Sequence, residues 1–151
     1  MAVHTQHLNM MMMTRSQRSK TVIPLQRQET RLPVPSYATP GAAGVDLRAA
    51  IDDPVIIPPN SSRLISSGII ILLPPSIKAE VRGRSGLALN HNVVAFNGLI
   101  DPDYRGTISV LLFNHSATKP YVVMPGERIA QLVFEPFLRV QFEEVEEIDA
   151  Q

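Results

Sequence analysis

Four short segments of this sequence combine glycine with charged, hydroxyl or amide side chains, the residue types that bind and act on anionic substrates. They are residues 43–47 (Ala-Gly-Val-Asp-Leu), 83–87 (Gly-Arg-Ser-Gly-Leu), 97–106 (Asn-Gly-Leu-Ile-Asp-Pro-Asp-Tyr-Arg-Gly) and 125–132 (Pro-Gly-Glu-Arg-Ile-Ala-Gln-Leu). Glycine lets the backbone approach a ligand closely, and a purely structural turn needs fewer charges than these segments carry. These four segments are therefore the candidates for chemistry.

The second segment contains an arginine and a serine that suit an anion. Ser85 can cap a short helix over residues 85–92, and free N–H groups at a helix start attract negative charge beside the Arg84 guanidinium. A plain helix cap beside a surface arginine is the alternative.

The third segment offers a carboxylate close to an aromatic ring. Asp101 follows an apolar pair and Tyr104 comes three residues later, so Asp101 is a candidate general base beside a flat stacking surface. The acidic spacing imitates the start of a calcium loop, but Arg105 and Leu112 occupy two positions that must supply ligands. A tight turn with solvated carboxylates is the alternative.

The first and fourth segments each place one polar side chain among apolar neighbours. Asp46 is either a ligand or a cap for nearby backbone N–H groups. Gln131 is neutral and suits a phosphate oxygen or a backbone partner equally. Spacing alone does not choose between these roles.

Several other chemistries lack the residues they need. The sequence has no Cys, which excludes disulfides and thiolate chemistry, and its four histidines are not at metal-ligand spacing. The glycine-rich nucleotide loops and the G-x-S-x-G elbow are absent from it as well. Fourteen basic residues balance fourteen acidic ones, and the longest apolar run, residues 68–77, is about half of a membrane span. We therefore expect neither a nucleic-acid nor a membrane partner.

The four segments lie among short β-type runs that are separated by turn residues. A length of 151 residues suits one domain, and 13 prolines and 8 glycines fit many short elements. We expect an all-β domain over residues 21–149 that follows a disordered N-terminal extension over residues 1–20. The predicted strands cover residues 21–25, 54–57, 63–73, 78–82, 107–113, 121–123, 128–134 and 138–145, and residues 85–92 are the single predicted helix.

Taken together and in this order, the four segments resemble motifs one to four of the trimeric deoxyuridine triphosphatases, the dUTPase family. The resemblance implies a jelly-roll-like distorted β-barrel and a homotrimer with active sites at subunit interfaces. It implies an enzyme, a dUTP diphosphatase that uses Mg²⁺ bound mainly through the triphosphate. The reaction it implies is hydrolysis of dUTP to dUMP and pyrophosphate by an activated water that attacks the α-phosphorus, which limits uracil in DNA and supplies dUMP.

The same resemblance implies roles for individual residues. Asp101 is then the catalytic residue that activates the water, and Tyr104 packs under the deoxyribose and excludes a 2′-hydroxyl. A hairpin over residues 93–101 selects uracil, and Asp46 supports the water shell of the metal. The substrate-binding residues implied are Arg84, Ser85, Gly86, Asn97, Gly98, Ile100, Tyr104 and Gln131.

A fifth motif of the family has no counterpart in the printed sequence. That motif is a flexible arm rich in Arg and Gly, whereas residues 146–151 read Glu-Glu-Ile-Asp-Ala-Gln. Because such an arm closes over the substrate, we expect low turnover without it. A weakly active or non-catalytic nucleotide-binding or interaction protein is one alternative, and a dCTP deaminase with related motifs is another. The expected location is intracellular, cytoplasmic or nuclear, with an organelle address in residues 1–20 as a further possibility.

Overall fold

The computed structural model describes residues 21–148, and the predicted extension over residues 1–20 lies outside the described residues. The described chain contains eleven strands and one short helix, so the all-β prediction is confirmed. The elements are β1 (Leu25–Arg27), β2 (Gly44–Arg48), β3 (Val55–Ile57), β4 (Ser61–Ser66), β5 (Ile69–Ile71), β6 (Ile77–Arg82), α2 (Ser85–His91), β7 (Val93–Ala95), β8 (Gly98–Ile100), β9 (Ser109–Asn114), β10 (Tyr121–Val123) and β11 (Arg128–Pro136).

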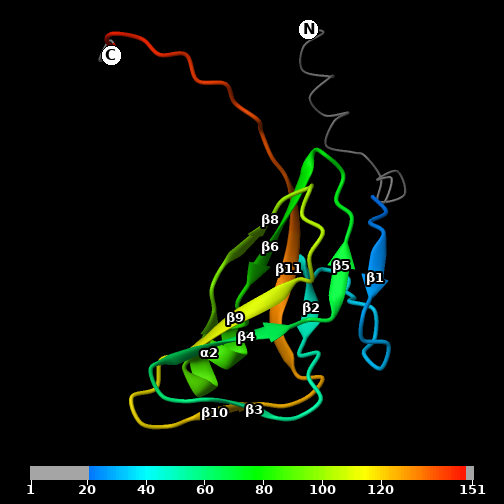
Figure 1. The fold of residues 1–151 in the computed structure, drawn as a ribbon, viewed down its shortest axis with the longest axis vertical. Helices are drawn as coiled ribbons and strands as arrows, with labels where there is room; N and C mark the ends of the chain where they lie inside the picture. The colour runs from blue at the N-terminus through cyan, green and yellow to red at the C-terminus, as the bar shows by residue number, and fades with distance from the viewer. Residues whose placement is uncertain (1–20, 149–151) are drawn as a thin grey trace, which may run out of the picture.

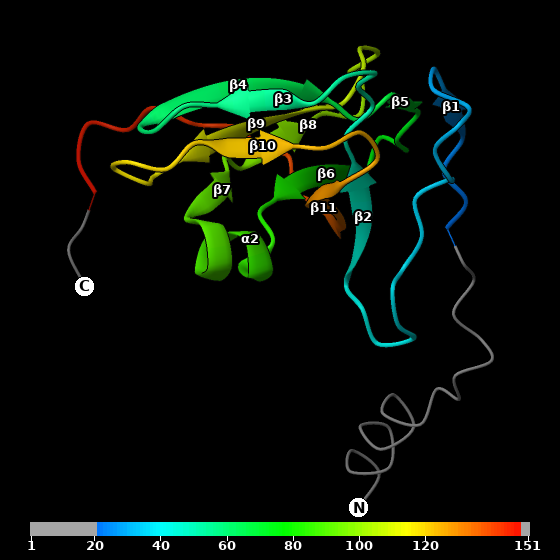
Figure 2. The same cartoon turned by 90° about the horizontal axis from the view of Figure 1, so that it is seen from below.

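The strands pair antiparallel in four small sheets that wrap around one core. The largest sheet has the order β2-β11-β6-β8, and a second has the order β4-β9-β7. Two further pairs, β1-β5 and β10-β3, complete the set. Figure 2 shows β3, β4, β9 and β10 together as one layer, with β6, β11 and α2 below them. The arrangement is the distorted β-barrel that the resemblance implies.

Alternation along the strands separates the core from the face that carries the polar residues. In β2, Val45 and Leu47 are buried while Asp46 between them points to the other side. The core is built almost wholly from Val, Leu, Ile and Ala, and Leu47, Ile57, Ile65, Leu112 and Ile129 are among its fully buried members. Each large apolar side chain buried in this way contributes about 1.5–3 kcal/mol to folding.

A β-bulge in β11 decides which of its side chains share a face with Asp46. The pairing with β2 shifts between Arg128 and Ala130, and Ile129 and Ala130 are both fully buried. In a regular strand, residues 128 and 131 would point to opposite faces because the period is two. The extra residue restores the same face for both, and Gln131 then pairs directly with Asp46.

The predicted strand over residues 63–73 is in fact two strands. Gly68 lies between β4 and β5 with a φ of 67°, a left-handed conformation that breaks a strand. After this break β5 pairs with β1, whereas β4 pairs with β9. Figure 1 shows the two strands in different parts of the molecule.

The predicted strand over residues 138–145 is wrong, since the last described strand ends at Pro136. Its apolar residues alternate with polar ones, but Leu138, Val140 and Phe142 are 70–91% exposed. Figure 1 shows this segment running away from the body of the fold. Alternation provides an apolar face, but a strand also has to hydrogen-bond to a neighbouring strand, and residues 138–145 pair with no strand of the described chain.

The predicted hairpin over residues 93–101 also needs a correction. Its two arms are strands, but β7 pairs with β9 and β8 pairs with β6. Within residues 21–148, β7 and β8 do not pair with each other. The chain therefore changes sheets at residues 96–97, and β8 becomes the edge strand of the four-stranded sheet.

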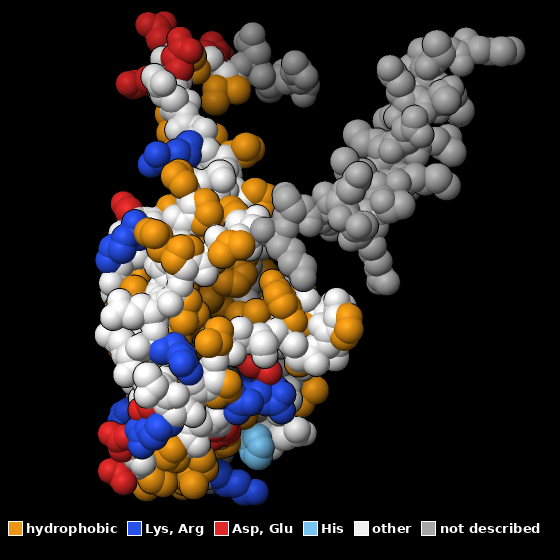
Figure 3. Space-filling view, turned by 90° about the vertical axis from the view of Figure 1, so that its right-hand side faces the viewer, with side chains coloured by type: hydrophobic (Ala, Val, Ile, Leu, Met, Phe, Trp, Pro, Cys, Tyr) orange, Lys and Arg blue, Asp and Glu red, His pale blue; other side chains and the backbone are white. Residues whose placement is uncertain are grey.

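The surface carries one open apolar groove, about 610 Å³ in volume. It lies between the β1-β5 pair and strands β2 and β11, and its walls include Leu25, Ile71, Val45 and Phe134. Figure 3 shows the hollow with hydrophobic side chains around it. Across the described residues, no helix is long and apolar enough to cross a membrane.

Candidate active site

A cluster of two arginines and one aspartate forms where β2, β11 and the start of α2 meet. Arg84 Nε lies 3.5 Å from Asp46 Oδ1, and Arg128 Nη1 lies 3.3 Å from Asp46 Oδ2. The Asp46 side chain is only 14% exposed, so its charge is largely removed from water and is balanced by both guanidiniums. We call Asp46, Arg84 and Arg128 the arginine cluster.

Backbone contacts hold the arginine cluster in place. Arg84 Nη1 donates to the backbone carbonyl oxygen of Arg128 at 3.0 Å. The Arg128 guanidinium in turn donates to the Asp46 carboxylate. Register adds Gln131 to the group, because Gln131 lies directly opposite Asp46 on β2 and opposite Arg82 on β6. The first, second and fourth segments of the sequence therefore meet on one face of one sheet.

The helix cap predicted for Ser85 is not formed. Arg84 is the cap residue of α2, no side chain caps the helix, and the Arg84 carbonyl accepts from the N–H groups of Leu87 and Ala88. The helix thus starts at Ser85 itself, and the Ser85 hydroxyl makes no hydrogen bond within residues 21–148. Its exposed hydroxyl is therefore available to a ligand.

The turn that leads into β11 is fixed by a glutamate. Glu127 accepts hydrogen bonds from the Met124 backbone N–H at 2.9 Å and from the Tyr121 hydroxyl. Burial, with the hydrogen bond to Glu127 second, raises the pKa of the Tyr121 phenol well above its ordinary value. Gly126 completes the turn with a φ of 75°. Arg128 therefore enters β11 from a rigid turn.

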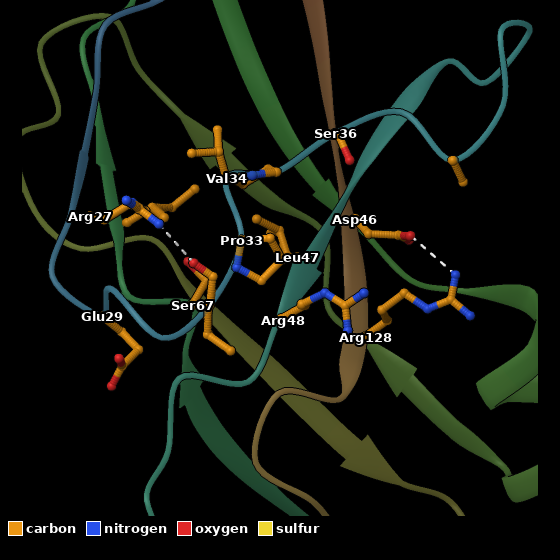
Figure 4. Close-up of a pocket in the computed structure, with 14 residues that line it drawn as sticks. Arg27, Glu29, Pro33, Val34, Ser36, Asp46, Leu47, Arg48, Ser67 and Arg128 are labelled. Atoms are coloured by element: carbon orange, nitrogen blue, oxygen red, sulfur yellow. Dashed lines mark hydrogen bonds and ion pairs between the residues drawn. The ribbon is translucent and has the colours of Figure 1, made fainter.

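A cleft of about 280 Å³ opens beside the arginine cluster and is shown in Figure 4. Arg27 and Arg48 line it together with Arg128, and Figure 4 shows Arg48 and Arg128 next to each other below Asp46. Arg27 Nη1 donates to the Leu32 carbonyl at 3.0 Å, and Arg48 Nη1 donates to the Gly126 carbonyl at 2.8 Å. These three arginines are not among the candidate residues predicted from the sequence, although Arg48 is two residues from Asp46 and Arg128 is three residues from Gln131.

The third segment forms a separate group at the other end of the sheet. Asp101 is exposed and lines a cleft of about 550 Å³, together with Asp103, Arg105 and Arg139. The Tyr104 N–H donates to the Asp101 carbonyl at 3.1 Å, which closes a tight turn. Residues 101–106 thus form a compact turn with one free carboxylate at its start.

Four further predicted residues lie outside these two groups. Asn97 is exposed and precedes β8, and Gly98 pairs with Val81 of β6. The Ile100 side chain is 8% exposed and packs in the core, so only its backbone is free to meet a substrate. Gly86 has open space around its α-carbon, since a β-carbon added there would meet no heavy atom within 4 Å.

The two groups lie at opposite ends of β6. Ala79 pairs with Ile100, so Asp101 follows at the level of Lys78, whereas Arg84 lies two residues beyond the other end of β6. Asp46 lies at the level of Arg82, because both pair with Gln131, and Arg82 is four strand residues, or about 13 Å, from Lys78. Strands β8 and β2 are three strand spacings apart in the sheet, or about 14 Å, so the two groups are about 20 Å apart. The structure therefore brings Asp46, Arg84 and Gln131 together in one group, and Asp101 and Tyr104 together in another. Within a single chain, the two groups are not in contact.

Sequence comparisons find a family and close relatives for this chain. A family model described as dUTPase matches residues 30–151. Proteins described as deoxyuridine 5′-triphosphate nucleotidohydrolase are similar to it. The relative in Anaplasma marginale is 45% identical over 121 residues, or 79% of this chain and 82% of the relative. The relative in Syntrophotalea carbinolica is 42% identical over 133 residues, or 86% of this chain and 90% of the relative.

Solved structures share the fold. A mutant dUTPase from phage phi11 of S. aureus, described with a structural Mg(II) ion, has a TM-score of 0.77 at 19% identity and covers 84% of this chain and 98% of its own. A mutant dUTPase from Staphylococcus bacteriophage 80alpha with dUpNHpp has a TM-score of 0.78 at 20% identity, and covers 87% of this chain and 100% of its own. At these identities the likeness concerns the fold.

Proposed function

The chain belongs to the dUTPase family and hydrolyses dUTP, and we propose that Asp101 activates the attacking water while the arginine cluster of a second copy holds the triphosphate. In this reaction a water oxygen bonds to the α-phosphorus, and the bond from that phosphorus to the bridging oxygen breaks. The products are dUMP and pyrophosphate. Family membership favours this hydrolysis over the deaminase alternative.

Asp101 suits the role of general base. Its carboxylate is exposed and lines a cleft, and it stands at the start of a turn whose backbone is tied by the Tyr104 N–H. The chain has no Cys to act as a nucleophile, which agrees with direct attack by water. The carboxylate takes the proton from the water as the new bond to phosphorus forms.

The arginine cluster and its neighbours suit the triphosphate. Guanidinium groups bind phosphate oxygens with two parallel hydrogen bonds, and both arginines are oriented by Asp46 before any substrate arrives. The exposed Ser85 hydroxyl and the Gln131 amide add donors on the same side, and Gly86 leaves room for a close backbone approach. Orientation before binding reduces the entropy lost when the substrate is held.

The observation that carries the proposal is the separation of the two groups along β6. A triphosphate is much shorter than about 20 Å, so one substrate cannot contact Asp101 and Arg84 of the same chain. We infer that the site combines Asp101 of one copy with Arg84 of another, as in the homotrimer that the resemblance implies. Paired apolar residues on the strand surfaces agree with association, since Ile56 faces Val122 and Leu64 faces Leu111 while all four are 37–68% exposed.

The edge strand β8 suits recognition of the uracil base. It is bonded to β6 on one side only, so N–H and C=O groups on its other edge are free to pair with a ligand. Backbone groups of residues 98–100 can match the donors and acceptors of uracil without any side chain. A close fit of this edge against the base then excludes the thymine methyl.

The acidic residues of the described chain fit a Mg²⁺ ion that arrives with the triphosphate. No group of three metal-binding side chains is found within residues 21–148, and both oxygens of Asp46 already face guanidiniums. Asp46 would support the ion through its water shell. The ion would neutralise phosphate charge, as Mg²⁺ does in other nucleotide sites.

The test is pyrophosphate release from dUTP with Mg²⁺, measured against dCTP, dTTP and UTP. We expect release from dUTP alone, and loss of that release in Asp101→Asn while dUTP still binds. Equal turnover by this variant would remove Asp101 from the mechanism, and equal rates on all four nucleotides would refute dUTP as the substrate.

A further inference from the structure

The Tyr104 ring lies folded back over the turn that carries Asp101, directly above Gly106. The Tyr104 hydroxyl donates to the carbonyl of Thr107 at 3.1 Å. A β-carbon added to Gly106 would stand 2.6 Å from Cζ and 3.2 Å from Cε2 of Tyr104, and closer still to its hydroxyl oxygen. Such distances are far inside van der Waals contact, so no side chain fits at residue 106 while the ring keeps this place.

Gly106 provides space here and not a special backbone conformation. Gly68 and Gly126 are the glycines with a positive φ in the described residues, and Gly106 is not among them. An alanine at residue 106 is therefore compatible with the backbone itself. The conflict is confined to the ring of Tyr104.

The backbone of the turn is held more firmly than the ring above it. Arg105 Nη1 donates to the Pro102 carbonyl at 2.7 Å and to the Tyr104 carbonyl at 2.9 Å, which ties the turn to itself. The next residue, Thr107, is anchored by a hydrogen bond from its hydroxyl to the Gln28 side chain at 2.5 Å. Tyr104 is 43% exposed, so its ring has free space on the outer side. Any group added at Gly106 would push the ring outward rather than unfold the turn.

We propose that Gly106 is a positioning residue for sugar selection, which sets how far the Tyr104 ring stands from the turn. The inference rests on the proposed function and on the role that the resemblance implies for Tyr104, whose ring packs under the deoxyribose. A β-carbon at residue 106 has to move the ring by about 1 Å to restore ordinary contact. That movement enters the space of the sugar, and a misplacement of about 1 Å in a positioning group costs between about tenfold and a hundredfold.

The test is a double-mutant cycle on Gly106 and Tyr104. Gly106→Ala should raise the KM for dUTP between about tenfold and a hundredfold and should change kcat much less, because Asp101 keeps its place. Adding Gly106→Ala to Tyr104→Ala should change neither KM nor the ratio of dUTP to UTP turnover. Tyr104→Phe should not rescue Gly106→Ala, since the clash with Cζ remains.

The matched control is Gly41→Ala, where an added β-carbon meets nothing within 4 Å. Thermal unfolding of each variant checks that the fold is retained, and binding of dUpNHpp is measured beside turnover. Gly106→Ala with unchanged KM and unchanged dUpNHpp affinity would overturn the inference. An equal rise in KM from Gly106→Ala with and without the Tyr104 ring would also overturn the inference, because the glycine would then act on the turn itself.

A failure of the proposed function has a different signature. In that case the unmodified chain and Gly41→Ala both release no pyrophosphate from dUTP. The double-mutant cycle can then be measured as dUpNHpp affinity, which still tests the coupling between Gly106 and Tyr104. If the two substitutions affect this affinity independently, the inference is overturned.

Discussion

A mixture of two inactive variants should regain activity if each site takes residues from two copies of the chain. Asp101→Asn removes the proposed general base, and Arg84→Ala removes a guanidinium that is proposed to hold the triphosphate. In one chain these residues lie at opposite ends of β6, separated by about 20 Å. Neither variant alone can then form an intact site. A mixed oligomer can, because an Arg84→Ala chain supplies Asp101 and an Asp101→Asn chain supplies Arg84.

The expected yield follows from random assembly. With equal amounts of both variants, half of the positions that supply Asp101 are intact and half of those that supply Arg84 are intact, so about a quarter of all sites are complete. The assay is pyrophosphate release from dUTP after both chains are unfolded and refolded together. Each variant refolded alone is the control.

Two results would refute this reasoning. If the mixture has no more activity than the separate variants, although mass measurement shows mixed oligomers, then both residues act in the site of one chain. A monomer at micromolar concentration with full activity would refute the shared site directly. Activity near a quarter of the unmodified chain would support the division of the site between copies.

Two other substitutions test the supports of the site. Asp46→Asn should lower kcat/KM for dUTP at least about tenfold, because two guanidiniums lose the charge that orients them, whereas the exposed Asp53→Asn should have no effect. Tyr121→Phe should lower the free energy of unfolding by about 1 kcal/mol at neutral pH, because Glu127 loses a donor. The pKa of Tyr121 is raised in the folded state. Its contribution to the free energy of unfolding is therefore complete below about pH 10 and is lost as the pH rises through the raised pKa. Urea unfolding at several pH values should therefore show a steeper alkaline loss in the unmodified chain than in Tyr121→Phe.

The strands that could be predicted from the sequence are those whose pattern depends on local residues. Residues 121–123 and all of residues 128–134 are strands as predicted, because β-branched and apolar residues stand on either side of the turn that contains Pro125 and Gly126. Strand β2 is absent from the predicted set, although its Gly-Val-Asp-Leu-Arg sequence alternates, because its glycine and aspartate favour a turn as readily as a strand. The break at Gly68 is absent from it too, since a single glycine inside an apolar run does not reveal a φ of 67°.

The strand predicted over residues 138–145 shows a different limit. Its alternation is real, and Leu138, Val140 and Phe142 all point to one side of an extended chain. Such a segment becomes a strand only if the edge of another strand lies beside it. The local sequence contains no information on where that edge lies. The same limit applies to residues 93–101, whose two arms found separate partners in β9 and β6.

Asp46, Arg84, Gln131 and Asp101 could be selected from the sequence as candidates, but Arg128 and the division into two groups could not. Asp46, Arg84 and Gln131 meet because the bulge in β11 turns Gln131 and Arg128 to the face that Asp46 occupies. The residue types do not predict that bulge, since Ile129 and Ala130 fit either face of a strand. Asp101 is separated from this group by the register of β8 on β6, which is set by long-range pairing. The sequence thus names candidate side chains for the chemistry, while the register of the strands places them in two groups and is the basis of the proposal that two copies supply them.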